Sequence, residues 1–219
     1  MPRFDTILFD LDGTLLHTIP DMLTSLNRAL RMYGRPERTL EDLRRYIGNG
    51  VRKLVSRALP DGENDPLYET IFAEYSRWYV VHSLDTTTPY DGILPLLEEL
   101  RARGISLCCV TNKPHSDAVP LIMKRFNALI PCVVGKKEGR QPKPAPDAVE
   151  EALSILGAKR ETTLYVGDSE VDYETAENTG LSCVLVSWGY RNRDVLEKLP
   201  ALGLIDRPEE LLRYILVEN

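Results

Sequence analysis

Two acids that lie two positions apart follow the first apolar segment of the chain. A bulky apolar run ends at Phe9, as expected for a strand buried in a parallel sheet, and Asp10 and Asp12 follow it. Burying a carboxylate is costly unless a positive charge offsets it. Gly13 lets the backbone approach a ligand closely, and Thr14 adds a hydroxyl. The pattern indicates a bound cation or a paired basic side chain, although an ordinary Asp-Gly turn has the same local sequence.

Further polar residues stand where later apolar runs end, or in the loop between two of those runs. They are Thr111, Asn112, Lys113, Lys143, Asp168 and Asp172. Because ligands of doubly wound sheets bind outside the carboxyl ends of the strands, these side chains are expected to meet at one edge of a sheet. Together they supply carboxylates, a hydroxyl, an amide and a lysine from separate parts of the chain, which is a much stronger indication of a chemical site than the first motif alone.

The elements that would position these residues alternate between strand and helix after residue 91. Strands are expected at residues 7–9, 105–111, 132–134, 163–166 and 182–186, and helices at 94–100, 116–126, 148–156, 171–179, 194–199 and 209–216. This alternation predicts an α/β fold with a doubly wound parallel sheet. Residues 17–83 instead show helical spacing with no convincing strand. They are predicted to form a small helical cap domain inserted into a core domain of residues 1–16 and 84–219.

Composition narrows the classes of protein that fit the chain. Its 219 residues carry a formal net charge of -6, and the pI is near 5.2, which argues against a general nucleic-acid binder. No apolar run approaches the ~20 residues that span a bilayer, and no signal-peptide core follows Met1, so we expect a cytoplasmic protein without a membrane partner. The four cysteines lie in apolar runs without Cys-x-x-Cys spacing, which indicates reduced cysteines of the core.

Four motifs of the chain resemble those of the haloacid dehalogenase superfamily. They are Asp10-Leu-Asp-Gly-Thr14, Thr111-Asn112, Lys143-Pro144 and Gly167-Asp168-Ser169-x-x-Asp172. Their order and spacing are similar to those of the superfamily's phosphatases with a helical cap after the first motif, and the resemblance covers essentially the whole chain. Other features resemble the phosphoglycolate phosphatase branch. These are Asp21, the turn Gly48-Asn49-Gly50, Thr111-Asn112-Lys113 and Trp188-Gly189-Tyr190.

The resemblance implies a mechanism in which the enzyme carries the phosphoryl group. Asp10 would be the nucleophile that forms an aspartyl-phosphate. Asp12 would protonate the leaving oxygen and later activate water. Lys143 would offset the charge that develops at the phosphoryl group. The phosphoryl oxygens would be held by the Thr111 hydroxyl and by backbone groups of the residues Leu11, Gly13 and Asn112.

The resemblance also implies a divalent cation beside the nucleophile. Asp10 and Asp168 would bind the metal through their carboxylates, together with the backbone carbonyl of Asp12. Asp172 would lie behind these ligands and orient Lys143 or a water molecule. Oxygen ligands of this kind suit Mg²⁺. Ser169 is expected either as a helix cap or as a contact of the site.

The substrate that the resemblance implies is a small phosphorylated acid, with 2-phosphoglycolate as the leading candidate. The turn at Gly48 and Asn49, with Arg52 and Lys53 after it, could bind a small anionic group or form a solvated surface. Alternatives on the same core are a sugar-phosphate or nucleotide monophosphatase, a pyrophosphatase and a β-phosphoglucomutase-like phosphotransferase. A catalytically silent sensor of a phosphometabolite is an alternative of a different class. The protein is expected to be a monomer or a homodimer.

Overall fold

The computed structural model describes residues 3–48 and 50–215 and divides the chain into two compact units. The core unit comprises Met1–Leu16 and Pro89–Asn219, and the helical unit comprises His17–Thr88. The helical unit therefore ends five residues later than the predicted limit at residue 83, since it closes at Thr88. Within the described ranges no helix has the length and apolar character needed to cross a bilayer.

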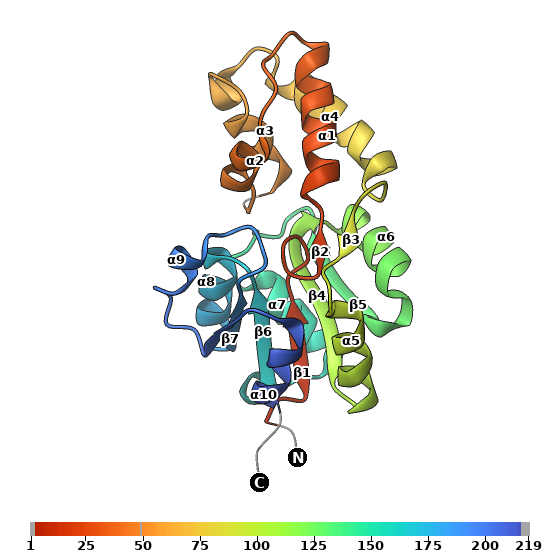
Figure 1. The fold of residues 1–219 in the computed structure, drawn as a ribbon, viewed down its shortest axis with the longest axis vertical. Helices are drawn as coiled ribbons and strands as arrows, with labels where there is room; N and C mark the ends of the chain where they lie inside the picture. The colour runs from red at the N-terminus through yellow and green to blue at the C-terminus, as the bar shows by residue number, and fades with distance from the viewer. Residues whose placement is uncertain (1–2, 49, 216–219) are drawn as a thin grey trace. The chain divides into compact units, whose positions relative to one another are not determined.

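A parallel sheet forms the middle of the core unit (Figure 1). Within the described residues it has six strands in the order β5-β4-β1-β6-β7-β8. Their bounds are β1 Thr6–Phe9, β4 Ser106–Pro114, β5 Cys132–Lys136, β6 Thr163–Gly167, β7 Ser182–Val186 and β8 Gly203–Ile205. Strand β1 pairs with β4 on one side and with β6 on the other. The order of the strands reverses at β1, and ligands of such sheets bind outside the carboxyl ends of the strands at this point.

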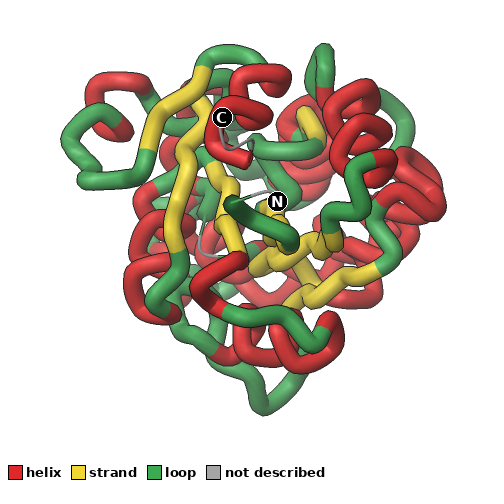
Figure 2. Tube along the Cα trace, turned by 90° about the horizontal axis from the view of Figure 1, so that it is seen from below, coloured by secondary structure: helices red, strands yellow, loops and turns green. Residues whose placement is uncertain are grey.

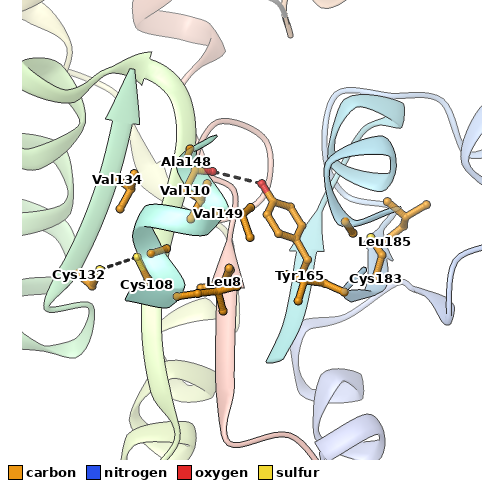
Figure 3. Packing of buried hydrophobic residues seen from close by; sticks show 14 of the residues in the cluster. Leu8, Cys108, Val110, Cys132, Val134, Ala148, Val149, Tyr165, Cys183 and Leu185 are labelled. Carbon is orange, nitrogen blue, oxygen red and sulfur yellow. Dashed lines mark hydrogen bonds between the residues drawn. The ribbon is translucent and has the colours of Figure 1, made fainter. Parts of the chain in front are cut away.

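Helices cover the sheet, as the red segments around the yellow strands in Figure 2 show. The α-helices of the core unit are α5 Ile93–Ala102, α6 His115–Phe126, α7 Asp147–Leu156, α8 Glu170–Thr179, α9 Arg193–Leu196 and α10 Leu212–Ile215. Side chains of α7 and α8 pack on Leu8, Val110 and other strand residues (Figure 3). Ile7 and Cys109 alternate with these along the strands and are also fully buried. Both faces of the sheet are therefore covered, and the predicted doubly wound α/β fold is confirmed.

Three features of the strands differ from the prediction. Strand β4 continues to Pro114 instead of ending at residue 111, so Lys113 still belongs to the sheet. Strand β8 was not predicted, because its three residues follow a loop and form no apolar run of their own. Two further strands, β2 Leu16–His17 and β3 Thr88–Pro89, pair where the chain passes between the two units, and two residues are too few to give a periodic signal.

The helical unit has a core of its own. Its α-helices are α1 Ile19–Met32, α2 Leu40–Tyr46, α3 Val51–Arg57 and α4 Tyr68–His82. Leu26 of α1 and Ile71 of α4 are fully buried. The buried rings of Tyr75 and Tyr79 stack on each other with centroids 5.5 Å apart. The aromatic residues of α4 thus contribute to the packing of this unit.

Asp21 joins the first helix of this unit to its last residues. Its buried carboxylate accepts the backbone N–H of Thr86, at 3.0 and 3.1 Å from the two oxygens, and the N–H of Thr87 at 2.8 Å. The hydroxyl of Thr86 donates to it as well. Burial acts to raise the pKa of Asp21, but these hydrogen bonds outweigh it and hold the pKa below its ordinary value. The contacts explain why residues 84–88 group with the helical unit.

Replacing Asp21 by Ala is expected to destabilise the helical unit by about 1–3 kcal/mol, because four hydrogen bonds to a charged acceptor are lost. Hydrogen exchange of the α1 amides measures this unit separately from the core. Since the folded-state pKa is lowered, the stabilisation is present above the unfolded-state pKa and is lost as the pH falls through the folded-state value. Glu37→Ala, which removes an exposed ion pair with Arg31, is the control. Unchanged exchange in Asp21→Ala would contradict this role.

Candidate active site

Lys143 lies at the centre of a buried cluster of charges in the core unit. Its Nζ is 2.7 Å from Oδ1 of Asp10 and 2.7 Å from Oδ1 of Asp172. It also donates to the hydroxyl of Tyr165 at 2.9 Å and to the carbonyl of Val110 at 3.2 Å. Burial acts to lower the pKa of Lys143, but the two carboxylates raise it well above its ordinary value. Lys143 is therefore a fixed positive charge beside Asp10.

The backbone of Lys143 is held by Asn112 at the end of β4. The side-chain carbonyl of Asn112 accepts the N–H of Lys143 at 2.7 Å, and its amide nitrogen donates to the Lys143 carbonyl at 3.0 Å. The two bonds join the loop that carries the lysine to the strand that carries Thr111. Thr111 is buried, and its Oγ1 accepts the backbone N–H of Lys113 at 3.1 Å. The Asn112 side chain thus positions Lys143, and its backbone amide stays a predicted contact of the phosphoryl group.

Three carboxylates converge beside this lysine. One oxygen each of Asp10, Asp168 and Asp172 lies within 4.8 Å of the other two. Burial, with the nearby charges of Asp172 and Asp12, raises the pKa of Asp10 to about 7 although Lys143 opposes the shift. Burial, with the nearby charges of Asp172 and Asp10, raises the pKa of Asp168 well above its ordinary value. The fold keeps these three carboxylates close together although they repel one another. A bound divalent cation would reduce this repulsion.

Asp172 differs from the other two acids in how its oxygens are used. Oδ1 accepts from Lys143, and Oδ2 accepts from the hydroxyl of Ser169 at 2.6 Å and from its N–H at 3.2 Å. The Ser169 side chain caps the N-terminus of α8 by accepting the N–H of Asp172 in return. Both oxygens of Asp172 are therefore engaged within the protein. This supports a role in orienting Lys143 and assigns Ser169 as a helix cap.

Asp168 sits in a space that two glycines leave open. Its Oδ2 accepts the backbone N–H of Tyr190 at 2.6 Å, and its Oδ1 lies 3.5 Å from the hydroxyl of Thr14. A Cβ on Gly13 or on Gly189 would lie far inside contact distance of the Asp168 side chain. Gly13 also has a positive φ of 96°, which favours glycine. Both positions therefore need glycine if Asp168 is to keep its place.

The segment after β7 holds the loop that follows β1. The indole N–H of Trp188 donates to the carbonyl of Thr14 at 3.1 Å, and the hydroxyl of Tyr190 donates to the carbonyl of Leu16 at 3.3 Å. The loop after β1 carries Asp12. Trp188-Gly189-Tyr190, which the sequence analysis used only as a resemblance, thus fixes two parts of the site relative to each other.

Replacing Gly189 by Ala is expected to displace Asp168 and lower kcat about 100-fold, a loss typical of a displacement of about 1 Å in an active site. The resemblance implies a Mg²⁺ ion bound by Asp168, so the Mg²⁺ concentration for half-maximal activity is expected to rise as well. Titration of activity with Mg²⁺ measures both effects. Gly157→Ala is the control, because a Cβ at Gly157 meets no atom within 4 Å and the strain from its positive φ of 61° is confined to the end of α7. Wild-type Mg²⁺ dependence in Gly189→Ala would contradict the proposed packing.

The structure brings most of the predicted site residues to the carboxyl edge of the core sheet. They are Asp10, Leu11, Asp12, Gly13, Thr111, Asn112, Lys143, Asp168 and Asp172. Gly48 lies in the helical unit, and Asn49 falls outside the described residues. Within the helical unit Arg52 pairs with Glu69 at 2.8 Å and Lys53 pairs with Glu63 at 2.8 Å.

Tyr165 is a residue of the site that the sequence analysis missed. Its hydroxyl accepts from Lys143 and lies 3.3 Å from Oδ1 of Asp172, and it donates to the carbonyl of Val110 at 3.4 Å (Figure 3). Burial raises the pKa of Tyr165 well above its ordinary value, so the phenol stays neutral. In the sequence this residue is part of an apolar run that predicts a strand. The available signal was its hydroxyl, because a buried tyrosine needs a hydrogen-bond partner.

A family model of haloacid dehalogenase-like hydrolases matches residues 7–186. The chain belongs to this family. It is 33% identical over 220 residues to phosphoglycolate phosphatase 1 of Pseudomonas aeruginosa, covering 97% of this chain and 79% of that relative. It is 36% identical over 221 residues to a phosphoglycolate phosphatase of Cereibacter sphaeroides, covering 96% and 98%. These relatives confirm the predicted family branch and the predicted class, a phosphoric monoester hydrolase.

The fold of this hydrolase also matches a crystal structure from Lactobacillus delbrueckii subsp. bulgaricus. The TM-score is 0.93 with 31% sequence identity, and the match covers 99% of this chain and 100% of the other. The hydrolase therefore shares its architecture with a solved protein over nearly its whole length.

Proposed function

We propose that this hydrolase converts 2-phosphoglycolate to glycolate and phosphate, with Mg²⁺ bound and with an aspartyl-phosphate on Asp10 as intermediate. The observation that carries the proposal is the geometry of Asp10. Its carboxylate lies at the end of the central strand, 2.7 Å from the Lys143 ammonium, within a cluster of buried acids. The curated relatives named for the phosphatase activity support the choice of substrate.

The residues present fit a Mg²⁺ ion. Asp10 and Asp168 each offer a buried carboxylate oxygen, and the pKa values of both acids are raised by burial first and by the neighbouring acids second, two costs that a bound cation would offset. The backbone carbonyl of Asp12 is the third proposed ligand. When bound, Mg²⁺ would offset the negative charge of the phosphoryl oxygens and stabilise the additional charge that develops on them. Asp172 is not proposed as a direct ligand, because Lys143 occupies one of its oxygens and the Ser169 hydroxyl occupies the other.

The reaction divides into two displacements at phosphorus. In the first, an oxygen of Asp10 forms a bond to phosphorus while the bond from phosphorus to the ester oxygen breaks. The leaving oxygen takes a proton from Asp12. In the second, Asp12 takes a proton from water, the water oxygen bonds to phosphorus, and the bond to Asp10 breaks. Phosphate is released, and both acids return to their starting states.

Lys143 and Thr111 stabilise the charge of the phosphoryl group during both displacements. Lys143 is already in contact with Asp10, so no reorganisation is needed as negative charge moves between the carboxylate and the phosphoryl oxygens. The Thr111 hydroxyl is proposed to donate to one of these oxygens. The Gly48 and Asn49 turn of the helical unit stays a proposed contact of the substrate.

Comparison of kcat/KM over a panel of phosphate esters tests the proposed substrate. We expect the highest value for 2-phosphoglycolate, above those for hexose phosphates, nucleoside monophosphates and pyrophosphate. A higher value for another ester would overturn the assignment. Conversion of a sugar 1-phosphate to its 6-phosphate would indicate a phosphotransferase, and absence of phosphate release from every ester in Mg²⁺ would indicate a sensor.

A further inference from the structure

Lys113 is a buried cation that the proposed reaction does not use. Only 3% of its side chain is exposed, although lysine is rarely buried without a charged partner. Its Nζ lies 3.1 Å from Oδ1 and 3.1 Å from Oδ2 of Asp12. Its backbone N–H donates to Oγ1 of Thr111, which fixes the strand at the base of the side chain. The lysine thus links the end of β4 to the acid that follows β1.

The site therefore contains two buried lysines that contact different acids. Lys143 contacts Asp10 and Asp172, whereas Lys113 contacts Asp12. The contact of Lys113 Nζ with both oxygens of Asp12 restricts the position of the carboxylate relative to the end of β4. An acid that must exchange protons at one atom of the substrate gains from such restriction, because small displacements reduce the rate of transfer.

We propose that Lys113 is a positioning residue for Asp12 and holds its carboxylate where it meets the leaving oxygen and, later, the attacking water. This inference rests on the proposed function, in which Asp12 exchanges protons in both displacements. In this proposal Lys113 acts through Asp12, which it contacts, and not through the substrate. Its removal should therefore lower kcat for an alkyl phosphate and leave KM for that substrate nearly unchanged.

A comparison of substrates with different leaving groups distinguishes this role of Lys113 from a general disruption of the site. An alkoxide leaves only with a proton, whereas p-nitrophenolate is stable without one. Loss of proton transfer by Asp12 should therefore lower the rate of the first displacement for an alkyl phosphate. The rate of this step for p-nitrophenyl phosphate should stay nearly unchanged. The second displacement also needs Asp12, so p-nitrophenyl phosphate should give a burst of one p-nitrophenolate per enzyme followed by slow turnover.

The experiment measures single-turnover rates of Lys113→Met and Asp12→Asn with the best alkyl phosphate of the panel and with p-nitrophenyl phosphate. For Lys113→Met we expect a loss of about 100-fold with the alkyl phosphate and of less than about threefold with p-nitrophenyl phosphate. The variant that combines Lys113→Met with Asp12→Asn should lose no more of the single-turnover rate than Asp12→Asn alone, because both changes remove the same function. Lys113→Arg should recover part of the rate. Lys159→Met is the control, because Lys159 is exposed and precedes the amino end of β6.

An equal loss on both substrates, or a raised KM with unchanged kcat, would overturn the inference. If the loss of rate in Asp12→Asn does not depend on the leaving group, the proposed role of Asp12 is wrong, and the proposed role of Lys113 is wrong with it. If Asp12→Asn shows the dependence and Lys113→Met does not, only the Lys113 inference fails. Lys113→Gln, which keeps a hydrogen-bond donor, replaces Lys113→Met in the same comparison if the latter does not fold.

Discussion

The Asp10→Asn variant is expected to lose at least about 10⁴-fold in kcat for 2-phosphoglycolate, the scale of loss when a covalent catalyst loses its nucleophile. An amide has nearly the shape of the carboxylate, but it does not attack phosphorus. The variant should remain folded, because Lys143 keeps its contact with Asp172 and the repulsion among the buried acids is reduced. Release of inorganic phosphate at saturating substrate and Mg²⁺ measures the loss.

Asp5→Asn provides a matched control for this variant. It is the same chemical change at an exposed residue that precedes β1, so it lies at the opposite end of the strand from Asp10. Wild-type kcat is expected for Asp5→Asn. Turnover by Asp10→Asn within about tenfold of the wild-type value would rule out Asp10 as the nucleophile.

Removal of divalent cations is expected to reduce turnover by about 10³-fold or more, since the cation contributes several kcal/mol to stabilising charge on the phosphoryl group. Dialysis against EDTA followed by titration with Mg²⁺ should abolish and then restore activity. Asp168→Asn should shift the restoring Mg²⁺ concentration upward, because it removes one charged oxygen from the cluster. Full activity in EDTA would contradict the proposed dependence on a cation.

The pH dependence of the metal-free protein follows from the same cluster. The pKa of Asp10 is raised from 3.8 to about 7 in the folded protein, so between these values the folded state binds a proton that the unfolded state has released. Asp10 therefore favours folding below its unfolded-state pKa, and this contribution is lost as the pH rises through about 7. In EDTA, the difference in Tm between wild type and Asp10→Asn should decrease as the pH rises from 3.8 to about 7. Binding of Mg²⁺ should release a proton below pH 7 and restore stability.

The sequence was sufficient to predict five of the six strands of the sheet and the residues at its carboxyl edge, because both follow from strong local patterns. The apolar run that ends at Phe9 and the run at 163–166 form adjacent strands, and adjacent strands bring Asp10 and Asp168 together. Strand β8 and the pair β2 and β3 are too short for such patterns, so their place depends on tertiary pairing. The end of the helical unit at Thr88 depends on hydrogen bonds to Asp21, which lies 65 residues from Thr86.

Residues that support the site were harder to predict than the motif residues themselves. The sequence around Tyr165 predicts only an apolar strand. The fold is needed to show that its hydroxyl accepts a hydrogen bond from Lys143. The backbone amide of Asn112 stays a predicted contact of the phosphoryl group, and no sequence pattern indicated that its side chain holds the Lys143 backbone 31 residues away. Lys113 was noted as part of a resemblance, and its contact with Asp12 spans 101 residues of chain. Such contacts depend on the register of β1 and β4, which no local pattern specifies.

Identification of the residue that carries the phosphoryl group tests the central claim most directly. Asp12→Asn protein, mixed with p-nitrophenyl phosphate and Mg²⁺ and quenched in acid, should accumulate the intermediate, because hydrolysis of the aspartyl-phosphate needs Asp12. Peptide mass spectrometry is predicted to find one phosphoryl group on Asp10. A phosphoryl group on another residue, or an unmodified Asp10 after a full burst of p-nitrophenolate, would contradict the account.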